Sequence, residues 1–248
     1  MTSSSQRFGS HAPLRDADPY DGVIVVDKPG GPTSHDIVDQ MRRAFGIKKV
    51  GHGGTLDPMA TGVLIILTGR GTKLSQRFMG SDKTYEGTIK LGIATNSQDA
   101  EGEIISEADP SHVTEDQLKD EMVKRVGDSF QKPPMVSAVK VDGVPLYKHA
   151  RKGKTVERKS RLIHVYEFSP LFFALPSADF RLRCTKGTYV RTLCSDIGES
   201  LGCGAHLTRL NRTQSGKISI KDATPYEDIM HMNRRELLDI LIPLNKFA

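Results

Sequence analysis

A continuous apolar run follows directly on a glycine-rich loop near the start of the chain. The run at residues 62–67, GVLIIL, contains no polar side chain, which is typical of a strand buried inside a domain. Three of the four residues at 51–54 are glycines, which permit unusual backbone angles and a close approach to a ligand. Asp57 stands in this loop before Pro58, which disfavours helical backbone for Asp57. We therefore expect one carboxylate on extended or turn backbone, anchored to a rigid core.

The whole string at residues 51–64 is more specific than its parts. It reads GHGGTLDPMATGVL and closely resembles the catalytic motif of the TruB family of tRNA pseudouridine synthases, GHxGTLDPxAxGVL. Four further segments resemble that family in the same order: DKPGGPTSHDIV at 27–38, KTYEG at 83–87, GTYVRTL at 187–193 and GAHLTRLNR at 204–212. Taken alone, the first of these four is equally consistent with a plain strand–turn–helix connection. The resemblance covers residues 21–244.

The resemblance implies a role for each matched site residue. Asp57 is the catalytic residue and Arg191 is its ion-pair partner. A buried carboxylate tends to take up a proton, and a neighbouring guanidinium opposes that shift. The remaining roles belong to substrate-binding residues: Tyr85 stacks on the target base, Tyr189 and Leu210 wall the pocket, and His52 braces the space that the flipped nucleotide leaves. Tyr85 also begins the buried face of a strand, so simple packing remains an alternative for it.

Alternation of buried and polar residues at 84–93 predicts a strand with one buried face. Thr114 and Gln117 form a capping box that predicts the start of a helix. Strands with interspersed helices indicate an α+β domain. The resemblance implies the pseudouridine synthase fold, a long mixed, mostly antiparallel sheet with flanking helices and a central catalytic cleft. We expect a disordered lead at 1–20, a catalytic domain at 21–248, and no C-terminal PUA-like domain of the kind that many relatives carry.

A strongly basic segment lies inside an expected insertion at about 131–161. Between residues 148 and 161 a single acid, Glu157, accompanies seven cations. These cations are Lys148, Arg151, Lys152, Lys154, Arg158, Lys159 and Arg161. A charge run is usually a solvated face, but this excess is large in a chain whose net charge is only +5. We interpret it as an RNA-backbone contact that grips phosphates.

Composition and spacing exclude several classes of chemistry. The sequence has no GxxxxGK[ST] or GxGxxG for nucleotide phosphates, no HExxH, and no HxE with a downstream PCxxC. We expect no metal and no cofactor. The cysteines (Cys184, Cys194 and Cys203) are odd in number and form no CxxC pair, which argues against a disulfide framework and fits the cytoplasm. No apolar run approaches the roughly 20 residues of a membrane span.

The inventory suits chemistry on a base taken out of an RNA stack. The resemblance implies isomerisation of uridine to pseudouridine at position 55, in the TΨC stem-loop of tRNA, by a monomer that requires no protein partner. Whether Asp57 attacks the base, attacks the sugar or removes a sugar proton stays open. Two alternatives also stay open: an RNA-binding module that aids tRNA folding without catalysis, and the catalytic subunit of a guide-RNA-dependent synthase. Gly53 departs from the family, which commonly has Thr or Ser there.

Overall fold

The computed structural model of the protein describes residues 18–137, 140–141, 143–146 and 156–247. Its elements up to the insertion are β1 (Gly22–Lys28), α1 (Ser34–Phe45), β2 (Val50–His52), β3 (Thr61–Thr68), η1 (Gly69–Leu74), α2 (Ser75–Met79), β4 (Lys83–Leu91), β5 (Ile93–Thr95), β6 (Ile104–Glu107), α3 (Glu115–Lys124) and β7 (Gly127–Gln131). From the insertion onward they are β8 (Lys140–Val141), β9 (Val144–Pro145), β10 (Arg161–Ala174), β11 (Ser177–Cys184), α5 (Val190–Ser200), β12 (Ala205–Ser215), β13 (Ile218–Ser219), η2 (Ile220–Asp222), β14 (Thr224–Pro225), α6 (Tyr226–His231), α7 (Arg234–Asp239), β15 (Ile242–Pro243) and η3 (Leu244–Phe247).

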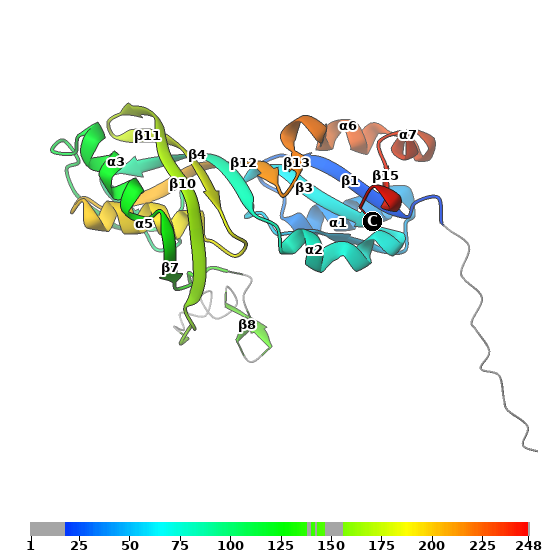
Figure 1. The fold of residues 1–248 in the computed structure, drawn as a ribbon, viewed down its shortest axis with the longest axis horizontal. Coiled ribbons are helices and arrows are strands. Elements are labelled where there is room, and N and C mark those ends of the chain that lie inside the picture. Colours follow the sequence, from blue (N-terminus) through cyan, green and yellow to red (C-terminus); the bar gives the residue numbers. More distant parts are fainter. Residues whose placement is uncertain (1–17, 138–139, 142, 147–155, 248) are drawn as a thin grey trace, which may run out of the picture.

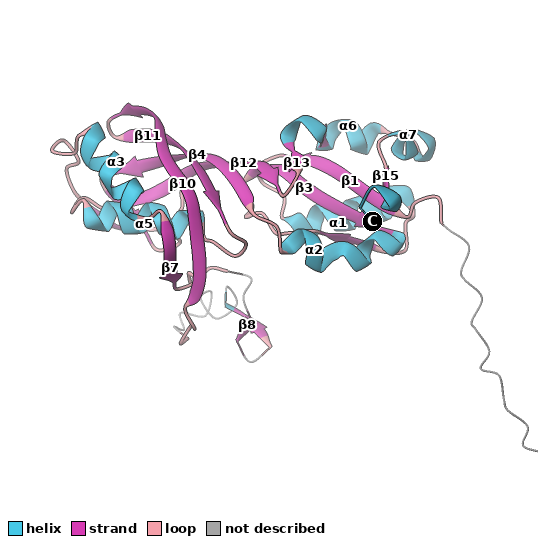
Figure 2. Cartoon of the chain, in the orientation of Figure 1, coloured by secondary structure: helices cyan, strands magenta, loops and turns pink. Residues whose placement is uncertain are grey.

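One sheet runs through the described part of the chain, in the order β14-β1-β3-β12-β4-β11-β10-β7, with β2, β13 and β15 paired alongside. Neighbouring strands are antiparallel except for β1 with β14 and β3 with β12. Figure 1 shows two lobes: β1, β3, α1, α2, α6 and α7 lie in one, and β10, β11, α3 and α5 in the other. Strands β4 and β12 connect them, and Figure 2 shows helices flanking the sheet in both lobes. The predicted α+β class is confirmed.

The late strand β12 joins the two lobes. It pairs with β4 along almost its full length, but with β3 over two residue pairs, Asn211 with Thr61 and Arg212 with Gly62. The connection from β3 to β4 is local in sequence, yet these strands lie on opposite sides of β12. The seam between β3 and β12 is therefore where residues from distant parts of the chain meet.

The apolar patterns predicted the central strands well. All residues of β3 except Thr61 are buried. β4 alternates from Tyr85 to Leu91, although Thr84 on the expected polar face is also buried, and Gly92, whose φ is 87°, ends the strand. Helix α1 buries Ile37, Val38, Met41 and Phe45 against the main core. The apolar spacing from Ile37 to Phe45 predicts this helix with Ser34 as its N-cap, but Thr33 supplies the cap. The hydroxyl of Ser34 instead forms hydrogen bonds with the backbone of Leu56.

Candidate active site

A pocket of about 380 Å³ opens between the two lobes, beside the seam. The residues that line it come from the Asp57 loop, from β4 and β12, and from the start of α5. They include Asp57, Lys83, Tyr85, Tyr189, Arg191, Leu210 and Arg212. The structure thus brings together five of the predicted site residues that are far apart in sequence: Asp57, Tyr85, Tyr189, Arg191 and Leu210.

The Asp57 loop is held by the last residue of β1 and by the backbone of the turn that follows it. Lys28 is completely buried, and its ammonium donates hydrogen bonds to the carbonyl oxygens of Pro29 (2.8 Å), Pro58 (3.0 Å) and Ala60 (2.8 Å). The N–H of Gly31 donates to the same Pro58 oxygen at 2.9 Å. The lysine and the glycine therefore fix the backbone on the C-terminal side of Asp57. Burial lowers the pKa of Lys28 to about 8, and the nearby Asp57 carboxylate opposes that shift.

Arg191 lies in the first turn of α5 and is nearly fully buried. Its Nη2 is 3.3 Å from Oδ2 of Asp57, and its Nη1 is 3.0 Å from Oδ2 of the buried Asp99. Nη2 also donates to the carbonyl oxygen of Val136 at 2.6 Å, at the base of the insertion. One guanidinium thus links two carboxylates and the insertion, and the aspartates hold its orientation.

The electrostatics of Asp57 follow from this arrangement. Burial raises the pKa of its carboxyl, Arg191 lowers it, and the neighbouring Asp99 raises it. The side chain is 39% exposed, and that surface faces the pocket it lines. Asp57 is therefore available to a ligand, while its charge is only partly compensated. Such a carboxylate is suited to act as a base or a nucleophile.

Sheet register positions two of the predicted pocket residues, Tyr85 and Leu210. Hydrogen bonds to the Gln131 side chain position a third, Tyr189. Tyr85 on β4 and Leu210 on β12 are both more than nine-tenths buried and both line the pocket. Tyr189 precedes α5, and its backbone N–H and C=O both bond to the side-chain amide of Gln131, at 2.7 and 3.0 Å. Burial raises the pKa of Tyr85 to about 12, so its hydroxyl remains protonated at neutral pH.

The structure separates His52 from the pocket. His52 ends β2, its Nδ1 accepts a hydrogen bond from the Gly54 N–H at 3.3 Å, and it is not among the described residues that line the pocket. Burial lowers the pKa of its imidazole. Of the predicted RNA-backbone residues, Arg158 donates to the Pro133 carbonyl at 3.0 Å and Lys159 is exposed. Arg161, the first residue of β10, lines the pocket. The other four, Lys148, Arg151, Lys152 and Lys154, lie outside the described residues.

Sequence reasoning missed several buried polar residues of the site. Lys28 and Asp99 were not singled out, although Lys28 stands in a segment that matched the family. Lys83, also missed, donates to the carbonyl oxygens of Phe78, Met79 and Ser81 and so holds the C-terminal end of α2 beside the pocket. A lysine at the start of a strand has no periodic signature that distinguishes a buried side chain from an exposed one. The matched segments were the only signal available for Lys28 and Lys83.

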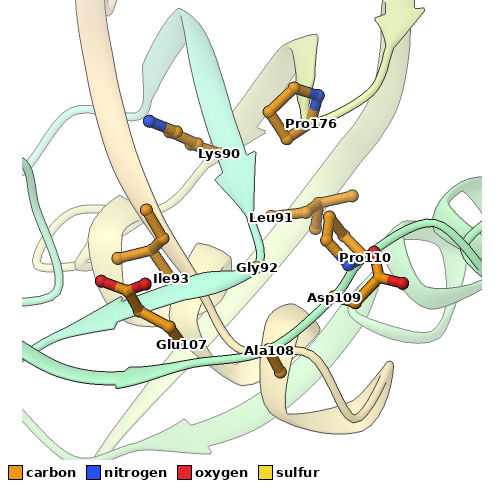
Figure 3. A pocket seen from close by; sticks show the side chains of 9 residues that line it. All are labelled: Lys90, Leu91, Gly92, Ile93, Glu107, Ala108, Asp109, Pro110 and Pro176. Atoms are coloured by element: carbon orange, nitrogen blue, oxygen red, sulfur yellow. The ribbon is translucent and has the colours of Figure 1, made fainter.

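Among the described residues, no other feature is as good a candidate for a functional site as this pocket. A second hollow of about 430 Å³ lies where β4 turns into β5, and Figure 3 shows Lys90, Glu107 and Asp109 spread around it rather than converging on one point. Within the described residues, no three His, Cys, Asp or Glu side chains are grouped as metal ligands would be. No helix in the described ranges has the length and apolar character needed to cross a membrane.

Comparison with known proteins agrees with the geometry. Residues 42–190 match the model of the TruB family pseudouridylate synthase N-terminal domain, and residues 191–247 match that of the tRNA pseudouridylate synthase B C-terminal domain. The chain is 52% identical to tRNA pseudouridine synthase B of Opitutus terrae, covering 92% of this chain and 95% of that protein. It is 46% identical to the Syntrophotalea carbinolica protein of the same name, over 90% of this chain and 73% of the relative. The crystal structure of a Cbf5-Nop10-Gar1 complex contains a similar chain, with a TM-score of 0.72 and 29% identity over 92% of this chain and 61% of that one.

Proposed function

Because this chain belongs to the TruB family of pseudouridylate synthases, we propose that it isomerises uridine to pseudouridine in tRNA, at position 55 of the TΨC loop. The observation that carries the proposal is the Asp57–Arg191 ion pair beside a pocket that Tyr85 and Leu210 line. A carboxylate, a guanidinium and an aromatic ring at one opening suit a flipped base. The tRNA substrate also agrees with the names of the relatives.

The reaction needs only groups that this chain supplies. The C1′–N1 bond of uridine breaks, the base turns, and a C1′–C5 bond forms. The hydrogen on C5 leaves as a proton and N1 gains one, so atoms and electrons balance without a group donor or an oxidant. Asp57 in its ionised form provides a nucleophile or a base, and Arg191 keeps its oxygens oriented. Tyr85 offers its ring as a stacking surface for the uracil.

Affinity for the tRNA is assigned to the insertion. We infer that the cations at 148–159 contact phosphates, since the Arg191–Val136 bond supports the view that the base of the insertion adjoins the pocket. We further propose that residues 21–248 form the catalytic domain, and that it acts as a cytoplasmic monomer without a protein partner.

Mass-spectrometric mapping of pseudouridine tests the proposal. A tRNA transcript incubated with the purified chain alone is expected to gain one pseudouridine, at position 55. A transcript with cytidine at that position is the matched control and should gain none. Modification only after a guide RNA or further proteins are added would favour a guide-dependent synthase. Tight binding without any modification would favour an RNA-folding aid.

A further inference from the structure

Arg212 is a buried arginine of β12 located at the seam between the lobes. Its side chain is 2% exposed, and its guanidinium donates to three backbone carbonyl oxygens. Nε donates to Val63 at 2.7 Å, Nη1 to Thr55 at 3.1 Å and Nη2 to Gly54 at 3.1 Å. Val63 belongs to β3, while Gly54 and Thr55 belong to the loop that carries Asp57. One side chain thus joins three segments.

This arginine has no acidic partner within the described ranges, where every ion pair involves other residues. A buried cation without a counter-ion costs free energy, and burial lowers the pKa of Arg212. The side chain of Tyr85, the residue directly opposite Arg212 on β4, opposes that shift. The arginine therefore gains its compensation from loop carbonyls and from the pocket tyrosine, rather than from a carboxylate.

Other residues anchor the Asp57 loop at Leu56 and beyond, so Arg212 is needed only for the upstream part of the loop. Lys28 holds the backbone after Asp57, and the hydroxyl of Ser34 bonds to both the N–H and the C=O of Leu56. Upstream of these anchors the backbone turns at Gly54, whose φ of 144° is open to glycine but strained for other residues. Arg212 bonds to the carbonyl of that glycine and to that of the next residue.

We propose that Arg212 is a positioning residue that fixes the Asp57 loop against Tyr85, its cross-strand neighbour on β4, so that carboxylate and aromatic ring keep one spacing around the target base. Arg212 bonds to the Asp57 loop and lies opposite Tyr85 in the register of β12 with β4, so a movement of the loop relative to Tyr85 must displace Arg212. The inference rests on the proposed function in one respect, namely that Asp57 and Tyr85 act on the same base. Misplacing reacting groups by about 1 Å lowers a rate by about 100-fold.

Amide hydrogen exchange tests the anchoring without reference to activity. We compare Arg212→Met and Arg212→Lys with Arg209→Met, a control on the same strand whose exposed side chain pairs with Asp179. Peptides covering residues 53–57 are expected to exchange faster in Arg212→Met, to an intermediate extent in Arg212→Lys, and as in the wild type in Arg209→Met. Unchanged exchange in folded Arg212→Met overturns the proposal. If that variant does not fold, the result for Arg212→Lys decides in the same way.

Kinetics then test the link to Tyr85. Arg212→Met should lower kcat about 100-fold while KM for tRNA stays within a few-fold, because the phosphate contacts are untouched. Tyr85→Phe removes the hydroxyl and keeps the ring, so it should lower kcat in the wild type but have no further effect beside Arg212→Met. Additive losses would show that the two residues act independently and would overturn the proposal. A wild-type chain that makes no pseudouridine refutes the proposed function instead, and the exchange experiment still decides on the anchor.

Discussion

The side-chain oxygen of Ser34 accepts a hydrogen bond from the backbone N–H of Leu56 at 2.8 Å and donates one to the carbonyl oxygen of the same residue at 3.1 Å. Both residues are buried. This reciprocal pair connects the first residue of α1 to the residue immediately before Asp57. The position of the carboxylate thus depends on a helix that contributes no side chain to the pocket lining among the described residues.

Removing this hydroxyl should weaken both the fold and the site. Ser34→Ala leaves a buried N–H and a buried C=O without their partner, which costs about 1–3 kcal/mol of unfolding free energy. We expect kcat to fall with little change in KM for tRNA. Urea denaturation and steady-state kinetics check the two effects. Ser106→Ala, on the exposed strand β6, is the control and should change neither; full activity of Ser34→Ala would refute the coupling.

Asp57→Asn should abolish isomerisation and keep tRNA affinity within a few-fold, because the change is isosteric and phosphate contacts dominate binding. It should also raise the melting temperature at pH 7. The pKa of Asp57 is raised in the folded state, so its ionised form opposes folding. The stability associated with the protonated group is present at acid pH and is lost as pH rises through the folded-state pKa.

The difference in melting temperature between the two proteins should therefore disappear below the unfolded-state pKa of about 3.8. Calorimetry at several pH values, together with pseudouridine mapping, measures both effects. Turnover comparable to the wild type would remove Asp57 from the mechanism.

Arg191→Ala should displace the acid limb of the pH–rate profile to higher pH. Arg191 lowers the pKa of Asp57, so its loss leaves the raising effects of burial and of Asp99 opposed by the smaller effect of Lys28. Less of the carboxylate is then ionised at a given pH, and kcat falls on the acid side first. Arg191→Lys keeps the positive charge, so its acid limb should lie between those of the wild type and Arg191→Ala. An acid limb that stays in place in Arg191→Ala would contradict the ion pair.

Replacing Lys152, Lys154 and Lys159 by Ala should weaken tRNA binding and leave kcat at saturating tRNA unchanged. Each lost phosphate contact should reduce the slope of log affinity against log salt by about 0.7 to 0.9. Titrations at several salt concentrations measure that slope. Substituting Lys48, Lys119 and Lys124, three exposed lysines outside the insertion, removes the same charge and should not alter it. Equal slopes for both triple variants would identify the segment as a solvated face.

Gly53→Ala should destabilise the protein by about 1–3 kcal/mol, the cost of overpacking a tight site. A Cβ at position 53 would lie 2.6 Å from the Cβ of Phe78 on α2, and that atom cannot rotate away. Gly51→Ala, two residues earlier on β2, meets the Thr72 side chain at an ordinary 3.7 Å and is the matched control. Chemical denaturation compares the two. Equal stabilities would show that α2 yields easily to the added methyl group.

The sequence predicted those parts of the fold whose information is local. The apolar run of β3 and the alternation of β4 are confirmed, because burial of one or both strand faces is written directly into the residue pattern. The sequence at 72–79, which ends before Gly80, predicts one short helix, but the structure has the 3-10 helix η1 followed by the short helix α2. The spacing of Leu118, Met122 and Val126 predicts one apolar helix face, but Val126 is 44% exposed because α3 ends at Lys124.

Only some of the site residues could be predicted from the sequence. Asp57, Tyr85 and Arg191 stand in distinctive strings, but Asp99 lies in a polar loop that resembles any other polar loop. The burial of Asp99 follows from the position of α5, because its carboxylate forms an ion pair with Arg191 of that helix. Serine favours the N-cap position, which predicts Ser34 there, yet Thr33 occupies it. Contacts between segments far apart in sequence decided both cases, and local propensity contains no information on them.

The position of β12 between β3 and β4 affects how the chain folds during its synthesis on the ribosome. Both neighbours are synthesised long before residue 205, where β12 begins, and the facing edge of each stays unpaired until then. Unpaired edges invite association between nascent chains, so this interval is when the polypeptide is most in need of chaperone protection. The same delay means that the pocket walls contributed by Leu210 and Arg212 arrive last, and a growing chain cannot engage its RNA productively before they emerge.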